Sequence, residues 1–500
     1  MVSSDLMLEN IALALSQFAS PGVLAAMIIG CAWGLLAGVL PGIGTVAALI
    51  VALPFTFGMT TEGSIALFMG IYVTSVYGGS ISAILINTPG TPQSAATGLD
   101  GYPMAQSGKA DLAIGWATLA SLIGGLFSLI VLIVAAPALA AVSISFGPAA
   151  IFAIIVFALT CIAWVSAGST VKGLLGATIG LWLTTIGPDG LTSLSRFDFG
   201  LPALRGGLSL IPVLIGLFAL SEVFYRAAYY FAGKPPDVQN VGFRLPAWAE
   251  IRLRVPQFFR SSVIGTFIGI LPGTGATAAT FVSYSELRRT SPRSENFGKG
   301  EPDGLIAAEA SNNAVTGGAL VPTLALGIPG DGGTVVLLGV LTIQGLTPGF
   351  DLINNNPHML TGVFLMLLVA NFVMFGLGAV SGRVFARVLN VPEPVLMGSI
   401  LIFSLVGAFV ARSNPVDVTI CVIAGFTGVI LRFGRYPVAP IVIGMALGSI
   451  FETKLRQGLI SARGDFWTFI QDPIALVILA LTAAILLIPA WRFLRKRDPA

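Results

Sequence analysis

The sequence predicts an all-α polytopic membrane protein built from two inverted-topology repeats, each with a re-entrant helical hairpin and a discontinuous helix. Three observations lead to this prediction. The composition is too poor in charge for a water-soluble surface, many apolar stretches are long enough to cross a bilayer, and one motif rich in glycine and proline occurs twice.

The composition excludes a soluble protein. Only 10% of the 500 residues are charged and 55% are hydrophobic, whereas soluble domains are about 25% charged. Most of the outer surface must therefore face lipid. The first residues include Asp5 and Glu9 but no Lys or Arg, so they do not form a secretory signal and we expect them in the mature protein. The three cysteines lie far apart in apolar stretches, which predicts neither a disulfide nor a metal site.

Spans of about 20 apolar residues are the elements that cross a bilayer. In the first half of the chain they are expected at 64–86, 112–140, 147–166, 169–187 and 208–231. In the second half they are expected at 305–326, 359–380, 395–411, 415–431, 437–451 and 473–491.

Basic stretches set the orientation, because cytoplasmic loops are rich in Lys and Arg. The stretches 232–260 and 286–304 and the C-terminus are basic and are predicted to be cytoplasmic. The segment 261–285 connects the basic stretches 232–260 and 286–304, so it must enter and leave the membrane on the cytoplasmic side. Its 25 residues are too few for two full crossings. It therefore predicts a re-entrant hairpin.

An internal duplication includes this hairpin. GLLAGVLPGIGTVAA at 34–48 aligns with GTFIGILPGTGATAA at 265–279 at a constant offset of 231, with the prolines and most glycines matched. Each copy is followed by an apolar helix broken at Pro-Gly, within 78–97 and 317–336. Five predicted spans separate the hairpins, and because five is odd the two copies have opposite orientations.

The predicted organisation follows from this duplication. The first repeat is 1–231 with its hairpin at 23–57, and a cytoplasmic linker covers 232–260. The second repeat is 261–500, with its hairpin at 261–285 and additional C-terminal spans. The absence of Lys and Arg before Lys109 and in the loop 347–358 predicts that these parts are external, whereas Lys454, Arg456 and Arg463 fit this topology less well.

Inverted repeats with broken helices are typical of transporters. A helix that restarts inside the membrane presents unpaired N–H groups, which attract anions, and such backbone must line a cavity or be buried in protein. We expect the hairpin tips and the helix breaks to meet around a carboxylate held by neutral donors, without a buried Arg. The predicted substrate-binding residues are Pro41, Gly42, Gly44, Thr45, Asn87, Thr88, Thr91, Pro272, Gly273, Thr274, Gly275, Thr277, Gly330 and Thr334, with Gln93 and Ser94 as further lining.

Some of the glycines have a purely structural alternative. Two series of glycines recur every four residues, which is the pattern of close helix packing: Gly30, Gly34, Gly38 and Gly42 in the first copy, and Gly265, Gly269 and Gly273 in the second. For Gly30 and Gly34 this interpretation explains more than ligand contact does.

The candidates for cation coupling are Glu309, Asn312, Asn313 and Asp331. An ionisable residue inside a membrane segment indicates function by default. Glu309 could instead be a carboxyl near the cytoplasmic end that snorkels or pairs with a loop residue, and Asp331 could close an Asx turn rather than bind a cation.

Enzymatic functions find little support. The segment GYPMAQSGKA at 101–110 lacks the first glycine and the Ser/Thr of a phosphate-binding loop, and neither a Ser/His/Asp set nor a metal-ligand cluster is visible. His358, the single histidine, lies at a loop edge. We therefore expect no enzyme, no cofactor beyond Na⁺ as a candidate coupling ion, and no nucleic-acid partner.

The paired GxLPGxG motifs at 38–44 and 269–275, NTPGTPQSAATGLDGYPMA at 87–105, EASNNAVTGGALVPTLALGIPG at 309–330 and LTIQGLTPGF at 341–350 are specific features. The chain that carries them resembles, over nearly its whole length, the large permease subunit of tripartite tricarboxylate transporters, the TctA type.

The resemblance implies a multi-pass subunit of the bacterial inner membrane. Its partners would be a small membrane subunit of the TctB type and a periplasmic solute-binding protein of the TctC type, which delivers a carboxylate such as citrate. A Na⁺ or H⁺ gradient would drive uptake. Two other functions stay open at this point: a passive channel or facilitator for organic anions, and a membrane scaffold in which the glycines only pack helices.

Overall fold

The computed structural model describes residues 4–40, 43–165, 170–192, 194–228, 241–388 and 392–495, and it is almost entirely helical. In these residues the one pair of strands consists of β1 (Gly187–Pro188) and β2 (Ser195–Arg196), which pair antiparallel with Gly187 opposite Arg196. The predicted all-α class is therefore confirmed.

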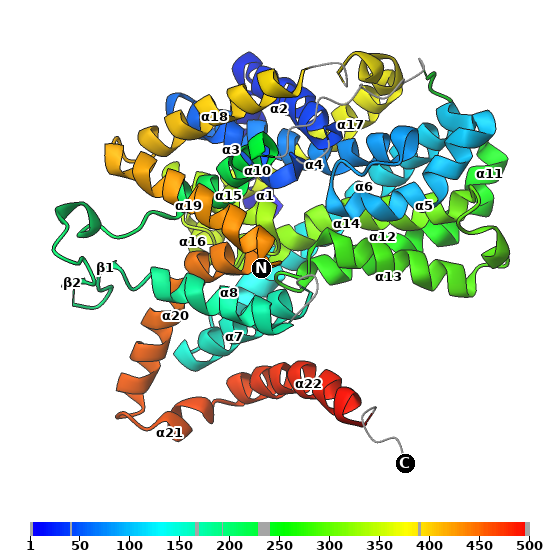
Figure 1. The fold of residues 1–500 in the computed structure, drawn as a ribbon. Helices are drawn as coiled ribbons and strands as arrows, with labels where there is room; N and C mark the ends of the chain where they lie inside the picture. The colour runs from blue at the N-terminus through cyan, green and yellow to red at the C-terminus, as the bar shows by residue number, and fades with distance from the viewer. Residues whose placement is uncertain are drawn as a thin grey trace.

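The remaining elements follow in chain order (Figure 1). The first half contains α1 (Ser4–Phe18), α2 (Pro21–Val39), α3 (Gly44–Ala52), η1 (Leu53–Gly58), α4 (Thr61–Ile86), η2 (Pro92–Ser94), α5 (Ala95–Met104), η3 (Ala105–Lys109), α6 (Ala110–Ser143), α7 (Pro148–Val165), α8 (Thr170–Leu183), η4 (Pro202–Leu204), α9 (Leu210–Ile215), η5 (Gly216–Leu220) and α10 (Ser221–Ala228). The second half contains α11 (Trp248–Leu253), α12 (Val255–Ile270), α13 (Gly275–Thr290), η6 (Ser294–Asn296), α14 (Pro302–Leu326), α15 (Gly332–Ile343), α16 (Phe350–Asn355), α17 (Pro357–Val388), α18 (Glu393–Val410), α19 (Pro415–Phe433), α20 (Ala439–Ser461), α21 (Phe466–Ile470) and α22 (Pro473–Arg495).

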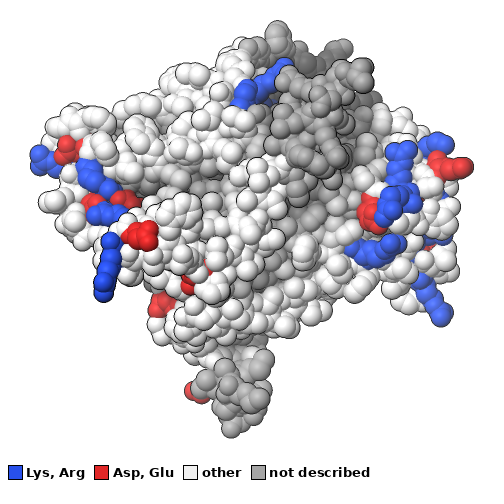
Figure 2. All heavy atoms as spheres, turned by 90° about the horizontal axis from the view of Figure 1, so that it is seen from below, with Lys and Arg blue, Asp and Glu red and all other residues white. Residues whose placement is uncertain are grey.

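The helices have the length and polarity of membrane spans. Each predicted span coincides with a helix, or with the run from α9 to α10 in the case of 208–231. Among the described residues, six helical stretches are long and apolar enough to cross a membrane: Pro21–Val39, Thr61–Ile86, Pro92–Ser143, Leu210–Ala228, Pro357–Val380 and Pro415–Phe433. On the face drawn in Figure 2, most charged side chains lie toward the left and right sides, a further basic group lies at the upper edge, and the surface between them is largely uncharged. A broad uncharged surface is consistent with a multi-pass membrane protein.

Two helical hairpins have the same local geometry. In the first, α2 ends at Leu40 (φ −74°, ψ 115°) and α3 begins at Gly44 with φ +64°. In the second, α12 ends at Leu271 (φ −75°, ψ 114°) and α13 begins at Gly275 with φ +70°. In both copies of the motif, one helix therefore ends and the next begins with nearly the same backbone angles at Leu40 and Leu271 and at Gly44 and Gly275. The opposite orientation of the two units in a membrane stays a prediction.

The second hairpin is longer than the predicted segment 261–285. Helix α12 begins at Val255 and α13 ends at Thr290, so both arms extend into stretches that the sequence indicated were loops. The last turn of α13 contains Arg288 and Arg289. Basic side chains are favourable at a helix C-terminus, and helical hydrogen bonding therefore continues beyond the apolar residues.

Each hairpin packs on the helix that follows it through close glycine contacts. A Cβ added at Gly34 would lie 2.3 Å from Thr74 Oγ1 on α4, and one at Gly265 would lie 2.3 Å from the Ser311 carbonyl oxygen on α14. Gly38 and Gly269, one turn later, approach α4 and α14 in the same way. The packing role predicted for these four glycines is therefore confirmed, whereas Gly273 lies against Ile162 of α7 and Gly42 is outside the described residues.

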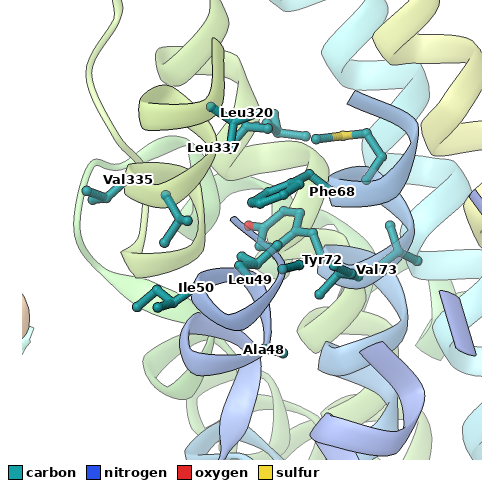
Figure 3. Close-up of a cluster of buried hydrophobic side chains, with 14 of the residues drawn as sticks. Ala48, Leu49, Ile50, Phe68, Tyr72, Val73, Leu320, Val335 and Leu337 are labelled. Atoms are coloured by element: carbon teal, nitrogen blue, oxygen red, sulfur yellow. The ribbon is translucent and has the colours of Figure 1, made fainter. Parts of the chain in front are cut away.

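The two long helices after the hairpins are broken at matching places. Helix α4 ends at Asn87, which has φ +52°, and α14 ends at Gly327, which has φ +69°. In each case a Pro-Gly pair follows, and a new helix starts a few residues later. Figure 3 shows that Leu49 of α3, Tyr72 of α4 and Val335 of α15 belong to one buried apolar cluster, which fixes the first hairpin against both breaks.

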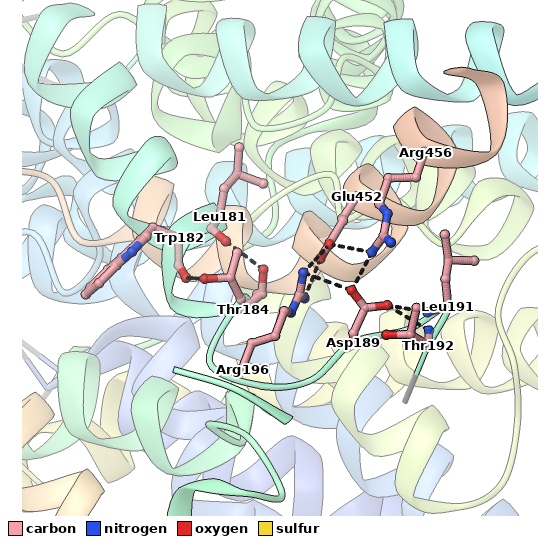
Figure 4. Close-up of polar contacts among 10 residues, drawn as sticks. Leu181, Trp182, Thr184, Asp189, Leu191, Thr192, Arg196, Glu452 and Arg456 are labelled. Carbon is pink, nitrogen blue, oxygen red and sulfur yellow. Dashed lines mark hydrogen bonds and ion pairs between the residues drawn. The ribbon is translucent and has the colours of Figure 1, made fainter. Parts of the chain in front are cut away.

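One of the three basic residues that fitted the predicted topology poorly has acidic partners. Arg456 of α20 contacts Asp189 in the loop after α8 and Glu452 one turn earlier on its own helix, and Arg196 of the same loop donates to both carboxylate oxygens of Glu452 at 2.6 and 2.9 Å (Figure 4). The charge of Arg456 is therefore paired with carboxylates.

Candidate functional site

Four helix starts converge on one cavity of about 600 Å³. These are the first residues of α3 and α13 at the two hairpin tips and the restarts at η2 and α15 after the two breaks. The wall is completed by side chains of α4, α14, η5, α10 and α19. The lining residues are Ile43, Gly44, Thr45, Val46, Tyr72, Val76, Pro89, Gly90, Thr91, Pro92, Gln93, Ala95, Phe218, Glu222, Gly275, Ala276, Thr277, Asn312, Val315, Thr316, Asp331, Gly332, Gly333 and Arg432.

The helix starts at the hairpin tips have no side-chain cap. The residues before them, Ile43 for α3 and Thr274 for α13, make no capping hydrogen bond. Helix α15, by contrast, is capped by the Asp331 carboxylate, which accepts from the Thr334 N–H at 2.8 Å. Uncapped first-turn N–H groups and the positive end of the helix dipole favour an anion. The two hairpin tips therefore offer the better anion site.

The structure brings five of the fourteen predicted substrate-binding residues into the cavity. Gly44, Thr45, Thr91, Gly275 and Thr277 line it, together with the coupling candidates Asn312 and Asp331 and the further lining residue Gln93. Asn87 and Thr88 are exposed and do not line it. Pro41 and Gly42 lie outside the described residues.

Other predicted residues shape the tips from behind. The Gly273 N–H donates to the Gly330 carbonyl oxygen at 2.6 Å, which fastens the second hairpin tip to the second break. The Thr274 hydroxyl donates to carbonyl oxygens at the end of α12, and Pro272 and Thr334 are buried. None of these residues lines the cavity. Their polar groups are used within the protein, so we assign them to the support of the site.

Glu309 lies in a cage of hydroxyl groups away from the cavity wall. Its side chain is fully buried. One carboxylate oxygen accepts from Ser80 Oγ at 2.5 Å and from Thr97 Oγ1, and the other accepts from Ser121 Oγ at 3.0 Å. Asn313 donates to the same Ser121 hydroxyl at 2.7 Å. The carboxyl neither snorkels nor pairs with a loop residue.

Several buried oxygen atoms at the cavity have no hydrogen-bond partner. They are Thr45 Oγ1, Thr91 Oγ1 and Asn312 Oδ1. Unpartnered buried polar atoms cost free energy unless a ligand or water satisfies them. Together with the Asp331 carboxylate, which also accepts from the Tyr72 hydroxyl at 2.8 Å, they form a set of oxygen donors of the kind that hard cations prefer.

Comparison with known proteins identifies the family. The model of the tripartite tricarboxylate transporter TctA family matches residues 24–443. The chain belongs to the TctA family. The match includes both hairpins, both broken helices and every residue that lines the cavity.

Two relatives from Agrobacterium vitis are similar to this TctA-family chain. One, an uncharacterized 52.8 kDa protein in the TAR-I ttuC' 3' region, is 34% identical over 494 residues, which cover 98% of each chain. The other, an uncharacterized protein in the TAR-II ttuC' 3' region, is 33% identical over 236 residues, which cover 47% of this chain and 97% of that relative. No solved structure matches.

Three lining residues of this TctA-family member were missed by the sequence analysis. Tyr72 lies in the middle of an apolar span, where its hydroxyl was a usable signal. Glu222 and Arg432 lie near the ends of spans, where charged residues are expected on general grounds. Arg432 lines the cavity with about half of its side chain exposed, so it is not the buried Arg that the sequence analysis expected to be absent.

Proposed function

We propose that the chain is the permease subunit of a secondary-active uptake system for a citrate-like tri- or dicarboxylate. The observation that carries this proposal is the convergence of four helix starts, two of them uncapped, on one cavity. Its volume falls within the range of about 300–1,000 Å³ that is usual for small-molecule sites. Helix starts of this kind hold anionic groups in transporters built from broken helices.

The partners and location belong to the same proposal. The family description as tripartite supports two further components. We propose a small membrane subunit of the TctB type and a periplasmic solute-binding protein of the TctC type, in a bacterial inner membrane. The chain would then act as a transporter and not as an enzyme.

A Na⁺ or H⁺ gradient is the proposed driving force. The unpartnered oxygens of Thr45, Thr91 and Asn312, with the carboxylate of Asp331, fit a Na⁺ ion and would hold it beside the solute. A cation there would offset the repulsion between Asp331 and an anionic solute. Glu309, with its three hydroxyl partners and with Asn313, is the group better suited to carry a proton, because an ionised carboxyl without a cationic partner is costly to bury.

Uptake into proteoliposomes tests the proposal. The three components are reconstituted together, and entry of labelled citrate is measured with an inward Na⁺ gradient, with an inward H⁺ gradient, and with neither. We expect uptake that requires one of the gradients and the binding protein. Uptake that proceeds equally without a gradient would contradict coupling and favour a passive facilitator.

A pair of threonine variants tests the site itself. Thr277→Val removes a hydroxyl from the cavity wall, whereas Thr178→Val removes an exposed hydroxyl on α8 that bonds only to the Leu174 carbonyl oxygen. We expect a loss of uptake in the first variant and wild-type uptake in the second. Equal activity of the two variants would indicate a scaffold role for the hairpin tip.

A further inference from the structure

The wall of the same cavity contains a charged cluster that the proposed function has not used. Helices α10 and α19 lie together (Figure 1), and they contribute Glu222 and Arg432 to the lining. Arg432 is the one basic side chain among the lining residues. Two carboxylates, Glu222 and Asp331, line the same cavity, so an anionic solute needs a fixed positive charge there.

The guanidinium of Arg432 is held in a defined plane. It lies over the ring of Tyr225, with the central carbon 3.7 Å from the ring centroid, and it contacts one carboxylate oxygen of Glu222. The other oxygen of Glu222 accepts from Arg226 Nε at 2.6 Å. Stacking on an aromatic ring orients an arginine and reduces the entropy that it loses when it binds a ligand.

Most of the hydrogen-bonding capacity of Arg432 is still available. A guanidinium has five N–H donors. One nitrogen of Arg432 donates to Glu222, and within the part of the chain that the structure describes its side chain has no other acceptor. About half of the side chain is exposed. Arginine binds carboxylates through two parallel hydrogen bonds, and the unused edge of Arg432 has the donors for one such contact.

From this geometry we infer that Arg432 binds a second carboxylate of the transported solute. The inference rests on the proposed function and names the residue through which the protein would distinguish solutes with two or more carboxylates from monocarboxylates. One carboxylate would lie at the uncapped starts of α3 and α13, and the other at Arg432. A monocarboxylate would engage only the first of these subsites.

Binding to the purified protein in lipid nanodiscs tests this inference, with citrate, succinate and propionate as probes of three, two and one carboxylates. Arg432→Gln removes the charge, and Arg432→Lys keeps it without the paired donors. Arg435→Gln is the matched control, because Arg435 is exposed three residues away and does not line the cavity. Thr277→Val reports on the hairpin-tip subsite, and the melting temperature of each variant reports on its folding.

We expect Arg432→Gln to weaken citrate and succinate binding by about tenfold or more, since a hydrogen bond to a charged group contributes at least that factor. Propionate binding should change by less than about twofold on the same reasoning, Arg432→Lys should be intermediate, and Arg435→Gln should bind as wild type.

Three outcomes would overturn the inference. Wild-type citrate binding by Arg432→Gln, together with a loss in Thr277→Val, would refute the role of Arg432 and leave the proposed function standing. Equal loss of all three probes in Arg432→Gln, with a lower melting temperature, would assign Arg432 a structural role. A wild-type protein that binds none of the probes would contradict the proposed function and the inference together.

Discussion

Variants of Asp331 test whether its carboxylate only caps helix α15 or also binds the coupling cation. Its carboxylate accepts from the Thr334 N–H at 2.8 Å and from the Tyr72 hydroxyl at 2.8 Å, and it lines the cavity. Asp331→Ala removes both contacts. Loss of a helix N-cap costs about 1 kcal/mol, and a buried hydroxyl left without an acceptor costs about 1–3 kcal/mol. Asp331→Ala should therefore reduce the free energy of unfolding by about 2–4 kcal/mol.

Asp331→Asn should behave differently. Asparagine is as good an N-cap as aspartate. Its carbonyl oxygen can accept from the Thr334 N–H while its NH2 group donates to the Tyr72 hydroxyl oxygen, so both contacts can be kept and the loss of stability should be below about 1 kcal/mol. If the charge holds the coupling cation, uptake should nevertheless lose its dependence on the ion gradient. Tyr72→Phe is the control, because it removes only the hydroxyl partner of the carboxylate.

The assay combines unfolding of the purified variants with gradient-driven citrate uptake. The expected order of stability is wild type, then Asp331→Asn, then Asp331→Ala. If Asp331→Asn retained the same cation dependence as wild type, the carboxylate would be only a cap. If it were as unstable as Asp331→Ala, the assignment of the stability loss to the cap and to the Tyr72 contact would be wrong.

Three further predictions concern the support of the site and the outer loop. Gly273→Ala places a Cβ 1.4 Å from Ile162 Cγ1, whereas the Cβ of Gly275→Ala has no atom within 4 Å and that variant costs only the left-handed backbone penalty of about 1–2 kcal/mol. Thermal unfolding should therefore show that Gly273→Ala is far less stable than Gly275→Ala. Equal melting temperatures of the two variants would contradict the contact with Ile162. Glu309→Ala leaves the hydroxyl groups of three residues without their acceptor, whereas Glu309→Gln keeps an acceptor oxygen. The alanine variant should therefore be the less stable of the two. Equal melting temperatures would show that these hydroxyl groups do not need an acceptor. The N–H groups of Thr192 and Leu191 and the guanidinium of Arg456 hold the pKa of Asp189 well below its usual range; the stabilisation is present above the unfolded pKa of about 3.9 and is lost as pH falls through the lowered folded pKa. Hydrogen exchange of the loop should therefore be protected equally at about pH 7 and pH 5, Asp189→Asn should lose protection at both, and a loss of protection in wild type between these pH values would refute the assignment.

The places where helices break could be predicted from sequence because they depend on local chemistry. Proline lacks a backbone donor and glycine tolerates positive φ. The motifs that begin at Gly38 and Gly269 therefore each interrupt a helix, and Gly44 and Gly275, where the next helix begins, have nearly equal positive φ values. The membrane class followed from composition for a similar reason, since it needs no knowledge of packing.

Side-chain direction at those breaks could not be predicted. Thr91 faces the cavity while Thr88, three residues earlier, is exposed, and the Thr274 hydroxyl bonds to carbonyl oxygens of its own helix end. The sequence pattern predicts the same role, contact with the solute, for all three threonines. Their directions depend on how each turn is seated against the neighbouring helices, and that information is distributed over the whole chain.

The sequence by itself determined that the chain is a multi-pass helical membrane protein with two duplicated hairpins, because hydropathy and helix breaking are properties of short segments. Only the tertiary structure decided which polar groups share a cavity. Glu222 and Arg432 come from helices outside both hairpins, and packing alone brings them to the cavity that the hairpin tips also line. Contacts of this kind arise from the burial of whole helix faces, which no local motif encodes.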